Sequence, residues 1–421
     1  MDMNAITLPR LQDLSNPGFD AFQAERDWRG DFADPYPLIH QLAAEGSVHH
    51  LNYRKLFTEV PDVQLGHMDQ WTVFGYDACN QVLMDSENFT NWEAFQHSLG
   101  ISFGRTITCM DGAEHARFRK VLQKALLPHV VSKWGESLVA PVMSRLMSKF
   151  IGRGSADLVE EYTHHFPFQI VYSMLHIGED QAAVFHKLAV AQLLSAAGLP
   201  QGKEATDKLG EFFQVYLDKV RANPADDLMS YLSTVEVDGE RLEDEVLIGF
   251  MRQLLNAGGD TTYRATSVLL TCLLQEPDLY QQVYEDRSLL GSAIEEALRW
   301  DGPVTSTFRY CMRDTEVQGT VIPAGAMVNV CLGSANRDPT KYENPDKFDI
   351  FRKRTVRHLA FAGGPHLCVG QHLARVEMHR AMEAVLDNLH NLRLDPDMPP
   401  PNIVGYKLRA PDHVFVKFDP A

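Results

Sequence analysis

Hydrophobic positions recur with a helical period through the middle of the chain, from about residue 114 to residue 300, and short alternating segments gather near both ends. The longest helical pattern runs from Leu242 to Gln275, with acidic residues at 243–245 in its first turn and Pro277 beyond its end. Such a helix would be roughly 50 Å long, so it has to cross the whole protein. The pair 258–259 places two glycines in its middle, each costing about 1 kcal/mol relative to alanine.

Shorter patterns complete the picture. Residues 289–299 read as a second helix, 315–330 as strand, turn and strand, and 338–357 as a long irregular loop. A last helix is expected over 369–386, and a strand broken by prolines over 392–418. No repeat and no Gly/Ser linker divides the chain, which favours one mainly helical domain with small β-sheets.

Composition narrows the class of protein. The chain has 421 residues, 45% of them apolar, which is enough to bury a large cofactor and still keep a core. A net charge of −17 argues against nucleic acid as the main partner. The six cysteines form no CxxC pair, the first 20 residues lack a signal peptide, and no apolar run is long enough to span a membrane. These features predict a cytoplasmic protein with reduced thiols.

The segment 361–370 carries the strongest chemistry. It has three glycines, which permit a tight turn close to a flat ligand, and it places Cys368 directly before a helix. In that position the sulfur can accept backbone hydrogen bonds and is favoured as thiolate. Two other roles stay open: Cys368 as a buried structural thiol, or a zinc site with His358, His366 and His372, whose spacing does not match that of paired zinc ligands.

Five positions of this segment fit a known pattern. They follow FxxGxHxCxG, the haem-binding pattern of bacterial cytochromes P-450, and the chain thus resembles that family. The matching residues are Phe361, Gly364, His366, Cys368 and Gly370.

The resemblance extends over residues 34–418. It implies the cytochrome P-450 fold, a triangular prism of helices that encloses one haem b, with Cys368 as the axial ligand of the iron. A thiolate ligand favours cleavage of the O–O bond, so the implied activity is that of a haem-thiolate monooxygenase. We expect a single domain over 1–421, with residues 1–33 as an N-terminal extension packed on its surface, and a monomer.

Ala257–Thr262 resembles the family's oxygen-binding stretch, (A/G)GxDT. Its glycines would let the helix open locally and give dioxygen space. By this resemblance Ala257 and Gly258 adjoin the cofactor, Thr261 hydrogen-bonds dioxygen or an ordered water, and Asp260 relays protons inward. The alternative is that the threonine hydroxyls bond to their own helix.

The helix over 289–299 contains the family's ExxR as Glu296 and Arg299, which lie on one face. The resemblance implies a buried structural triad completed by Arg352, with Arg354 as its competitor, and the triad would brace the cysteine loop.

Haem carries two propionates, and the fork of donors in arginine suits carboxylates. The stretch 111–119 resembles the start of the family's third helix, although Gly112 and Ala113 replace its usual prolines. By resemblance, four residues would bind the propionates: His115, Arg119, Arg309 and His366.

A monooxygenase needs two electrons, and no flavin or iron–sulfur segment is visible. We therefore expect an acidic ferredoxin as donor, supplied by a ferredoxin reductase and NAD(P)H. A local excess of positive charge would steer it. The residues concerned are Arg352, Lys353, Arg354 and Arg357, with Arg117, Lys120 and Lys124.

The substrate pocket is expected along five segments: 89–103, 190–197, part of the long helix, 304–307 and 404–406. A mid-sized hydrophobic substrate such as a terpenoid, a steroid or a fatty acid would suit it. The expected pocket residues are Leu254, Ala257, Val304, Thr305, Thr307 and Tyr406.

Two alternative functions stay open for the chain. They are peroxide-dependent oxygenation and the role of a non-catalytic haem sensor or carrier.

Overall fold

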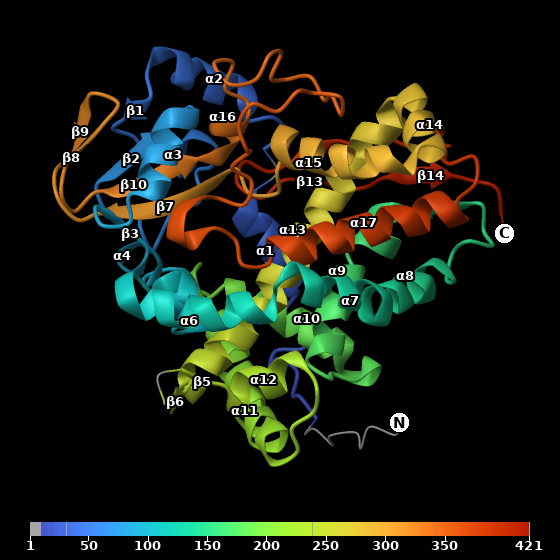
Figure 1. Cartoon of the computed structure of the whole chain (residues 1–421), viewed down its shortest axis with the longest axis horizontal. Coiled ribbons are helices and arrows are strands. Elements are labelled where there is room, and N and C mark those ends of the chain that lie inside the picture. Colours follow the sequence, from blue (N-terminus) through green and yellow to red (C-terminus); the bar gives the residue numbers. More distant parts are fainter. Residues whose placement is uncertain (1–9, 31, 238, 421) are drawn as a thin grey trace.

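The computed structural model describes residues 10–30, 32–237 and 239–420, which are mostly helical (Figure 1). The helices are α1 (Ala21–Arg29), α2 (Tyr36–Glu45), α3 (Tyr76–Met84), α4 (Trp92–Phe95), α5 (Leu99–Phe103), α6 (Gly112–Ala125), α7 (Pro128–Trp134), α8 (Ala140–Met147), α9 (Phe166–Met174), α10 (Glu179–Leu193), α11 (Pro200–Ala222), α12 (Leu228–Thr234), α13 (Asp244–Gln275), α14 (Pro277–Glu285), α15 (Leu290–Trp300), α16 (Leu332–Asn336) and α17 (Gln371–Asn388). Short 3₁₀ turns include η2 (Ile107–Cys109) and η6 (Gly364–His366).

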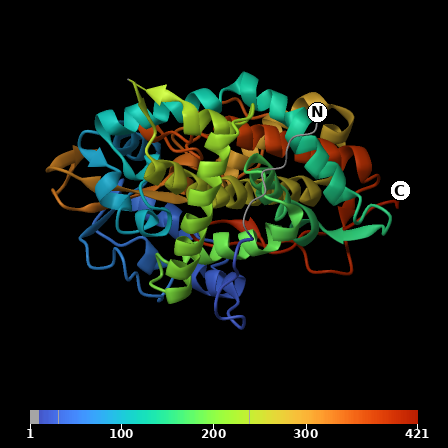
Figure 2. The ribbon, with the colours of Figure 1, turned by 90° about the horizontal axis from the view of Figure 1, so that it is seen from below.

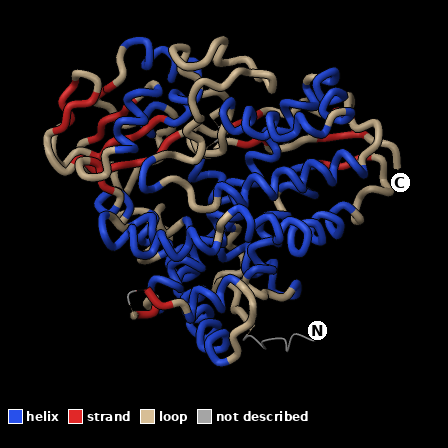
Figure 3. Tube along the Cα trace, in the orientation of Figure 1, coloured by secondary structure: helices blue, strands red, loops and turns tan. Residues whose placement is uncertain are grey.

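The strands form one five-stranded sheet of order β1-β2-β10-β7-β3 and several smaller pairings. Figure 3 shows most of them gathered at one side of the molecule, while helices fill the rest. Their bounds are β1 (Val48–His49), β2 (Gln70–Val73), β3 (Phe89–Thr90), β4 (Ser155–Asp157), β5 (Glu236–Val237), β6 (Glu240–Arg241), β7 (Ser306–Cys311), β8 (Thr315–Val317), β9 (Thr320–Ile322), β10 (Met327–Cys331), β11 (Arg393–Leu394), β12 (Ile403–Val404), β13 (Ala410–Pro411) and β14 (Phe415–Lys417).

Helix α13 crosses the middle of the molecule, as its length requires (Figure 2). It contacts α9, α11, α15 and α17, and from Thr262 to Leu274 every residue of it is buried. The outline is broad at the sheet and tapers towards α11 in Figure 1, and it is thin in Figure 2. This is the mainly helical prism with small sheets that the sequence analysis expects.

One element differs from its expectation. We expected 315–330 to form two strands around a turn at 323–325. Instead β8 and β9 pair with each other across Gln318 and Gly319, which both have positive φ, and β10 pairs with β2 and β7. A two-residue turn with positive φ at both positions suits the twist of a hairpin, although Pro323 and Gly325 are the stronger turn residues in the sequence.

The N-terminal region is described from residue 10, so residues 1–9 of the expected extension lie outside the described residues. Leu11 and Leu14 join the main hydrophobic core, and α1 contacts α10. Among the helices of the described residues, none combines the length and the apolar character that crossing a membrane requires.

Candidate active site

Cys368 lies between η6 and α17, at the end of a tightly folded loop. Its backbone N–H donates to the carbonyl of Phe361 at 2.9 Å. Gly364 has a φ of 65°, and a Cβ there would collide with the backbone of Leu83, so only glycine fits this approach. All six cysteines lie in the described part of the chain, and Cys368 alone among them is exposed.

The sulfur of Cys368 faces a hollow enclosed by protein. Burial raises the pKa of the thiol, while backbone N–H groups of Gly370 and Gln371 and the cations Arg119 and Arg375 favour the thiolate. A metal cation at the sulfur would supply the missing stabilisation. The position is therefore suited to a ligand of a metal.

A cavity separates this loop from α13. Its empty volume, which includes the open space at its mouth, is about 1550 Å³. The residues named in the sequence analysis that line it are Leu254, Ala257, Gly258, Thr261, Val304, Thr307, Phe361, Cys368 and Gly370, with His115, Arg119, Arg309 and His366.

At one edge of the cavity the structure brings together four groups that the sequence analysis assigned to propionates. Arg119 and Arg309 have no ion-pair partner within the described residues, and Arg309 is only 2% exposed. Burial lowers the pKa of Arg309 to about 10, so it stays charged at neutral pH. Buried charges without a partner are costly.

Two histidines complete this edge. The rings of His115 and His366 lie 4.1 Å apart between centroids. Nε2 of His366 lies 3.2 Å from Asp111, whereas the buried Nε2 of His115 has no hydrogen-bond partner. Burial lowers the pKa of His115 to about 4. The cations Arg119 and Arg309 and the unpaired ring nitrogen of His115 fit a ligand that carries two carboxylates, and haem is such a ligand.

Behind the cysteine loop lies a closed ion cluster. Glu296 accepts from Arg299 at 2.7 and 2.9 Å and from Arg352 at 3.0 Å, and all three side chains are at most 7% exposed. Arg354 instead donates to the backbone carbonyl of Ser292. The triad is therefore completed by Arg352, and it holds 343–352 against α15.

The comparisons with known proteins agree with this geometry. The family model described as cytochrome P450 matches residues 37–414. The chain belongs to the cytochrome P450 family. It is thus a haem-thiolate enzyme of the monooxygenase type, and its cofactor is haem b.

Individual relatives support the assignment. The putative cytochrome P450 YjiB of Bacillus subtilis (strain 168) is 32% identical over 349 residues, which cover 81% of this chain and 87% of that protein. The cytochrome P450 monooxygenase PikC of Streptomyces venezuelae is 31% identical over 388 residues, covering 89% and 88%. The structure of CYP109E1 from Bacillus megaterium in complex with testosterone is 26% identical, with a TM-score of 0.79, and the match covers 92% of this chain and 99% of that one.

In this cytochrome P450 the stretch 257–262 lies on an uninterrupted α13. The expected local opening of the helix is absent. A Cβ on Gly259 would lie 2.5 Å from the ring of Phe168, and one on Gly258 would lie 2.9 Å from Val171. The two glycines therefore let α9 pack closely against α13.

Thr261 and Asp260 point in different directions. Thr261 lines the cavity, and its hydroxyl donates to the carbonyl of Ala257 at 3.1 Å. Asp260 lines a second, polar cleft on the other side of α13 and accepts from Arg264 at 2.8 and 2.9 Å. Burial favours a lower pKa for Arg264, but the carboxylate of Asp260 more than offsets it, so this pKa is raised.

Sequence reasoning missed Glu377 on α17, which lines the cavity and is 1% exposed. Burial raises its pKa well above the usual range, against a hydrogen bond with the side chain of Thr262, and its Oε2 has no partner. Burial therefore favours the protonated form of Glu377. The sequence did contain a signal for Glu377, because α17 follows Cys368 directly and Glu377 lies nine residues after that cysteine.

The placement of two expected pocket residues needs correction. Thr305 and Tyr406 are not among the residues that line the cavity. The hydroxyl of Thr305 donates to the carbonyl of Tyr406 at 2.5 Å, and the ring of Tyr406 stacks on Phe57. The hydroxyl of Thr305 thus serves the local backbone, as threonine hydroxyls often do.

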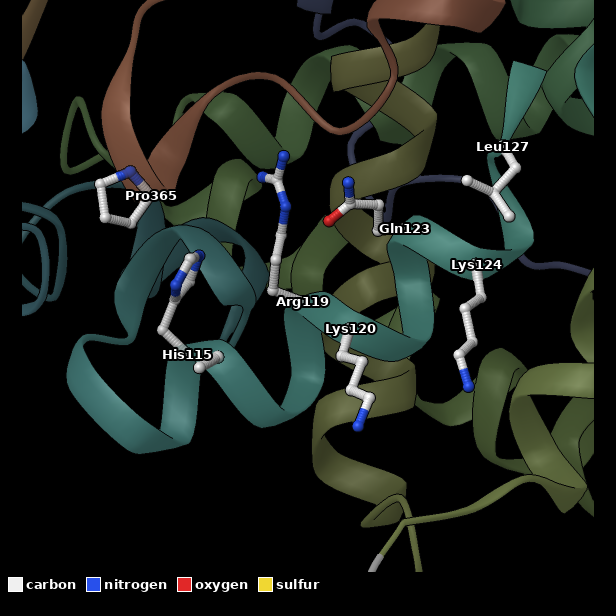
Figure 4. A pocket seen from close by; sticks show the side chains of 8 residues that line it. His115, Arg119, Lys120, Gln123, Lys124, Leu127 and Pro365 are labelled. Carbon is white, nitrogen blue, oxygen red and sulfur yellow. The ribbon is translucent and has the colours of Figure 1, made fainter.

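The face beside α6 carries a shallow hollow with several cations (Figure 4). Arg119, Lys120 and Lys124 line it, together with Pro365 of the cysteine loop. Arg352 does not belong to the expected basic surface, because its side chain is buried in the triad. Lys353, Arg354 and Arg357 are exposed, and Arg117 pairs with Glu240.

The zinc alternative finds no support. No cluster of three or more His, Cys, Asp or Glu side chains able to hold a metal ion occurs in the described ranges. His358 instead lies 3.2 Å from Glu295.

Proposed function

We propose that this cytochrome P450 inserts one atom of dioxygen into a C–H bond of a mid-sized hydrophobic substrate, with electrons from an acidic ferredoxin. The cavity lined by both Cys368 and Thr261 carries this proposal, because it brings the iron ligand and the expected oxygen-site residue to one largely apolar space. Haem bound at Cys368 supplies the activation of dioxygen. The chain's own groups have to hold that cofactor, orient the substrate and deliver protons.

The proposed propionate ligands are His115, Arg119, Arg309 and His366. Arg119 and Arg309 lack a carboxylate in the described structure, and a propionate would offset the cost of burying Arg309 and of half-burying Arg119. Phe361 and Gly370 line the cavity beside Cys368, while Gly364 shapes the loop against Leu83.

Proton delivery is proposed to run along α13. Asp260 faces a polar cleft that is separate from the cavity, and Thr261 faces the cavity one residue further on. A carboxylate held by Arg264 can take a proton from water in the cleft, and the Thr261 hydroxyl can donate one into the cavity. Glu377, which bonds to Thr262 and whose pKa is raised by burial, is a second group able to hold a proton at this level.

The electron donor is proposed to dock over the hollow beside α6. Arg119, Lys120 and Lys124 line this hollow and give this part of an acidic protein a local positive charge. Such a patch accelerates encounter with an acidic partner. The rate of the first electron transfer should therefore fall as ionic strength rises, and a flat response would contradict this docking.

The substrate is proposed to be terpenoid, steroid or fatty acid in class. The cavity wall is largely apolar, with Leu254, Phe250 and Val304 among its members. CYP109E1, which shares this fold at 26% identity, has been solved in complex with testosterone.

The decisive experiment is the spectrum of the reduced protein with carbon monoxide. We expect the long-wavelength band of sulfur-ligated haem, and its loss in Cys368→Ser. Turnover with NADH, ferredoxin reductase and ferredoxin should exceed turnover with hydrogen peroxide. The opposite ranking would favour a peroxide-dependent oxygenase, and binding without product would favour a haem sensor or carrier.

A further inference from the structure

Gln253 and Thr108 form a hydrogen-bonded polar pair in the cavity wall. Gln253 of α13 donates from its side-chain Nε2 to the hydroxyl oxygen of Thr108 in η2 at 2.7 Å, and both residues line the cavity. Asn91, which also lines the cavity, supports the pair, because its side-chain nitrogen donates to the backbone carbonyl of Thr108 at 3.2 Å. The side chain of Asn91 is 2% exposed, so this support is fixed within the core.

An amide and a hydroxyl joined by one hydrogen bond keep further capacity to bond. With Nε2 bound, Gln253 retains its carbonyl oxygen as an acceptor, and the hydroxyl hydrogen of Thr108 is still available as a donor. If the side-chain amide of Gln253 were flipped, Thr108 would donate its hydroxyl hydrogen to the amide oxygen. An N–H of Gln253 would then be the donor available to the substrate, and the hydroxyl oxygen of Thr108 the acceptor. Either arrangement presents one donor and one acceptor to the cavity.

The pair lies on the same face of α13 as the oxygen-site residues. Gln253, Ala257 and Thr261 follow one another at intervals of four, which stacks them on one side of a helix. Eight residues at 1.5 Å each place Gln253 roughly 12 Å along the axis from Thr261. A polar group of the substrate bound at the pair would therefore be separated from the reacting C–H bond by about the length of a fused ring system.

The charge of the wall determines which head group the pair accepts. Within the described residues, the only lysines or arginines that line the cavity are Arg119 and Arg309, at the propionate edge. A carboxylate at Gln253 would lose its hydration without gaining a cation, and this is costly. A neutral hydroxyl needs one acceptor and one donor, which the pair offers.

We infer that Gln253 and Thr108 bind a neutral hydroxyl or ketone of the substrate, so that the enzyme selects oxygenated terpenoid- or steroid-sized compounds over free fatty acids. This inference deepens the proposed function and rests on it. It also gives the polar bond between Gln253 and Thr108 a role in a cavity wall that is largely apolar.

The test uses the holoenzyme and two matched pairs of probes. Testosterone is compared with androstane, which lacks its oxygen atoms, and dodecanol with dodecanoic acid. Binding is measured from the spin-state shift of the Soret band. We expect wild type to bind testosterone more tightly than androstane, and dodecanol more tightly than dodecanoic acid.

Two variants then isolate the pair. Gln253→Leu and Thr108→Val should each weaken binding of testosterone and dodecanol about 3- to 10-fold, the value of one hydrogen bond. Binding of androstane should change less than about 2-fold. The double variant should lose little more than either single variant, because the two groups act together. Thr108→Ser, which keeps the hydroxyl, should restore most of the affinity.

Several outcomes would overturn the inference. They are equal losses for testosterone and androstane, tighter binding of dodecanoic acid than of dodecanol, and no spin-state shift with either oxygenated neutral probe. Every variant is first checked for the sulfur-ligated band with carbon monoxide. Wild type with that band but with unselective binding would overturn the polar pair and leave the monooxygenase proposal standing, whereas wild type without it would overturn both.

Discussion

Two groups of buried or half-buried arginines contrast in this protein. Arg299 and Arg352 are closed on Glu296, and Arg264 is closed on Asp260, with every N–O distance at or below 3.0 Å. Arg119 and Arg309, by contrast, line the cavity without an ion-pair partner in the described structure.

The presence or absence of an ion-pair partner separates arginines that stabilise the fold from arginines that are suited to bind an anionic ligand. A closed cluster satisfies its charges within the chain, and it is broken at high cost when one member is removed. An open arginine destabilises the chain by itself and is stabilised only when an anion arrives. Each prediction below either breaks a closed cluster or removes an open cation.

The largest effect is expected for Glu296→Gln, which leaves Arg299 and Arg352 buried without an anion. We expect a loss of about 3–5 kcal/mol in the free energy of unfolding, measured by urea denaturation of the holoenzyme. The matched control is Glu383→Gln in the partly exposed pair with Arg380, which should cost less than about 1 kcal/mol. Similar losses in both variants would remove the distinction between buried and exposed clusters.

Asp260→Asn breaks the second closed pair at the oxygen site. If Asp260 relays protons, product formation should fall about 10²- to 10³-fold, with less product per NADH consumed and a larger solvent isotope effect. Glu245→Gln, at an exposed acid in the first turn of the same helix, should change the rate less than about 2-fold. An unaltered yield of product in Asp260→Asn would assign the pair to structure alone.

Much of this division could be predicted from the sequence. The cysteine loop and the ExxR motif have fixed local spacing, and the period of α13 showed a helix that crosses the protein. Because those signals are local, the closed triad and the cavity face of α13 followed from them. The choice between Arg352 and Arg354 did not, since it depends on how an irregular loop folds against α15.

Other features depend on tertiary contacts that no spacing reports. The sequence predicted a local opening of the helix at Gly258 and Gly259, but α13 is uninterrupted there and the two glycines pack closely against Phe168 and Val171. Thr305 was placed in the pocket by its position in the chain, yet its hydroxyl bonds to the backbone of the 404–409 turn. Gln253 could have been found, because it lies one helical turn before Ala257, while its partner Thr108 comes from a distant loop.

Arg309→Leu removes an open cation and should separate the two groups of arginines. The free energy of unfolding of the haem-free protein should not fall, because a buried charge without a partner is removed. Haem should leave the holoenzyme about 30-fold faster, as expected for about 2 kcal/mol of a lost buried ion pair. Haem transfer to an acceptor protein measures this rate, with Arg313→Leu at an exposed site as control. If Arg309→Leu instead destabilised the haem-free protein as much as breaking a closed cluster does, Arg309 would belong with the closed group.

The smallest effect concerns Glu295, which is closed on His358 and Arg375 but is only half-buried. Although burial favours a higher pKa, hydrogen bonds from His358 and Arg375 lower the pKa of Glu295 to about 2. A lowered carboxyl pKa stabilises the fold above the unfolded value, near 4.3, and this contribution is lost as pH falls from there towards 2. Glu295→Gln should therefore cost about 1–2 kcal/mol at pH 7, and urea denaturation should show the difference shrinking below about pH 4.3. A difference that stays constant with pH would mean that packing, rather than charge, holds this pair closed.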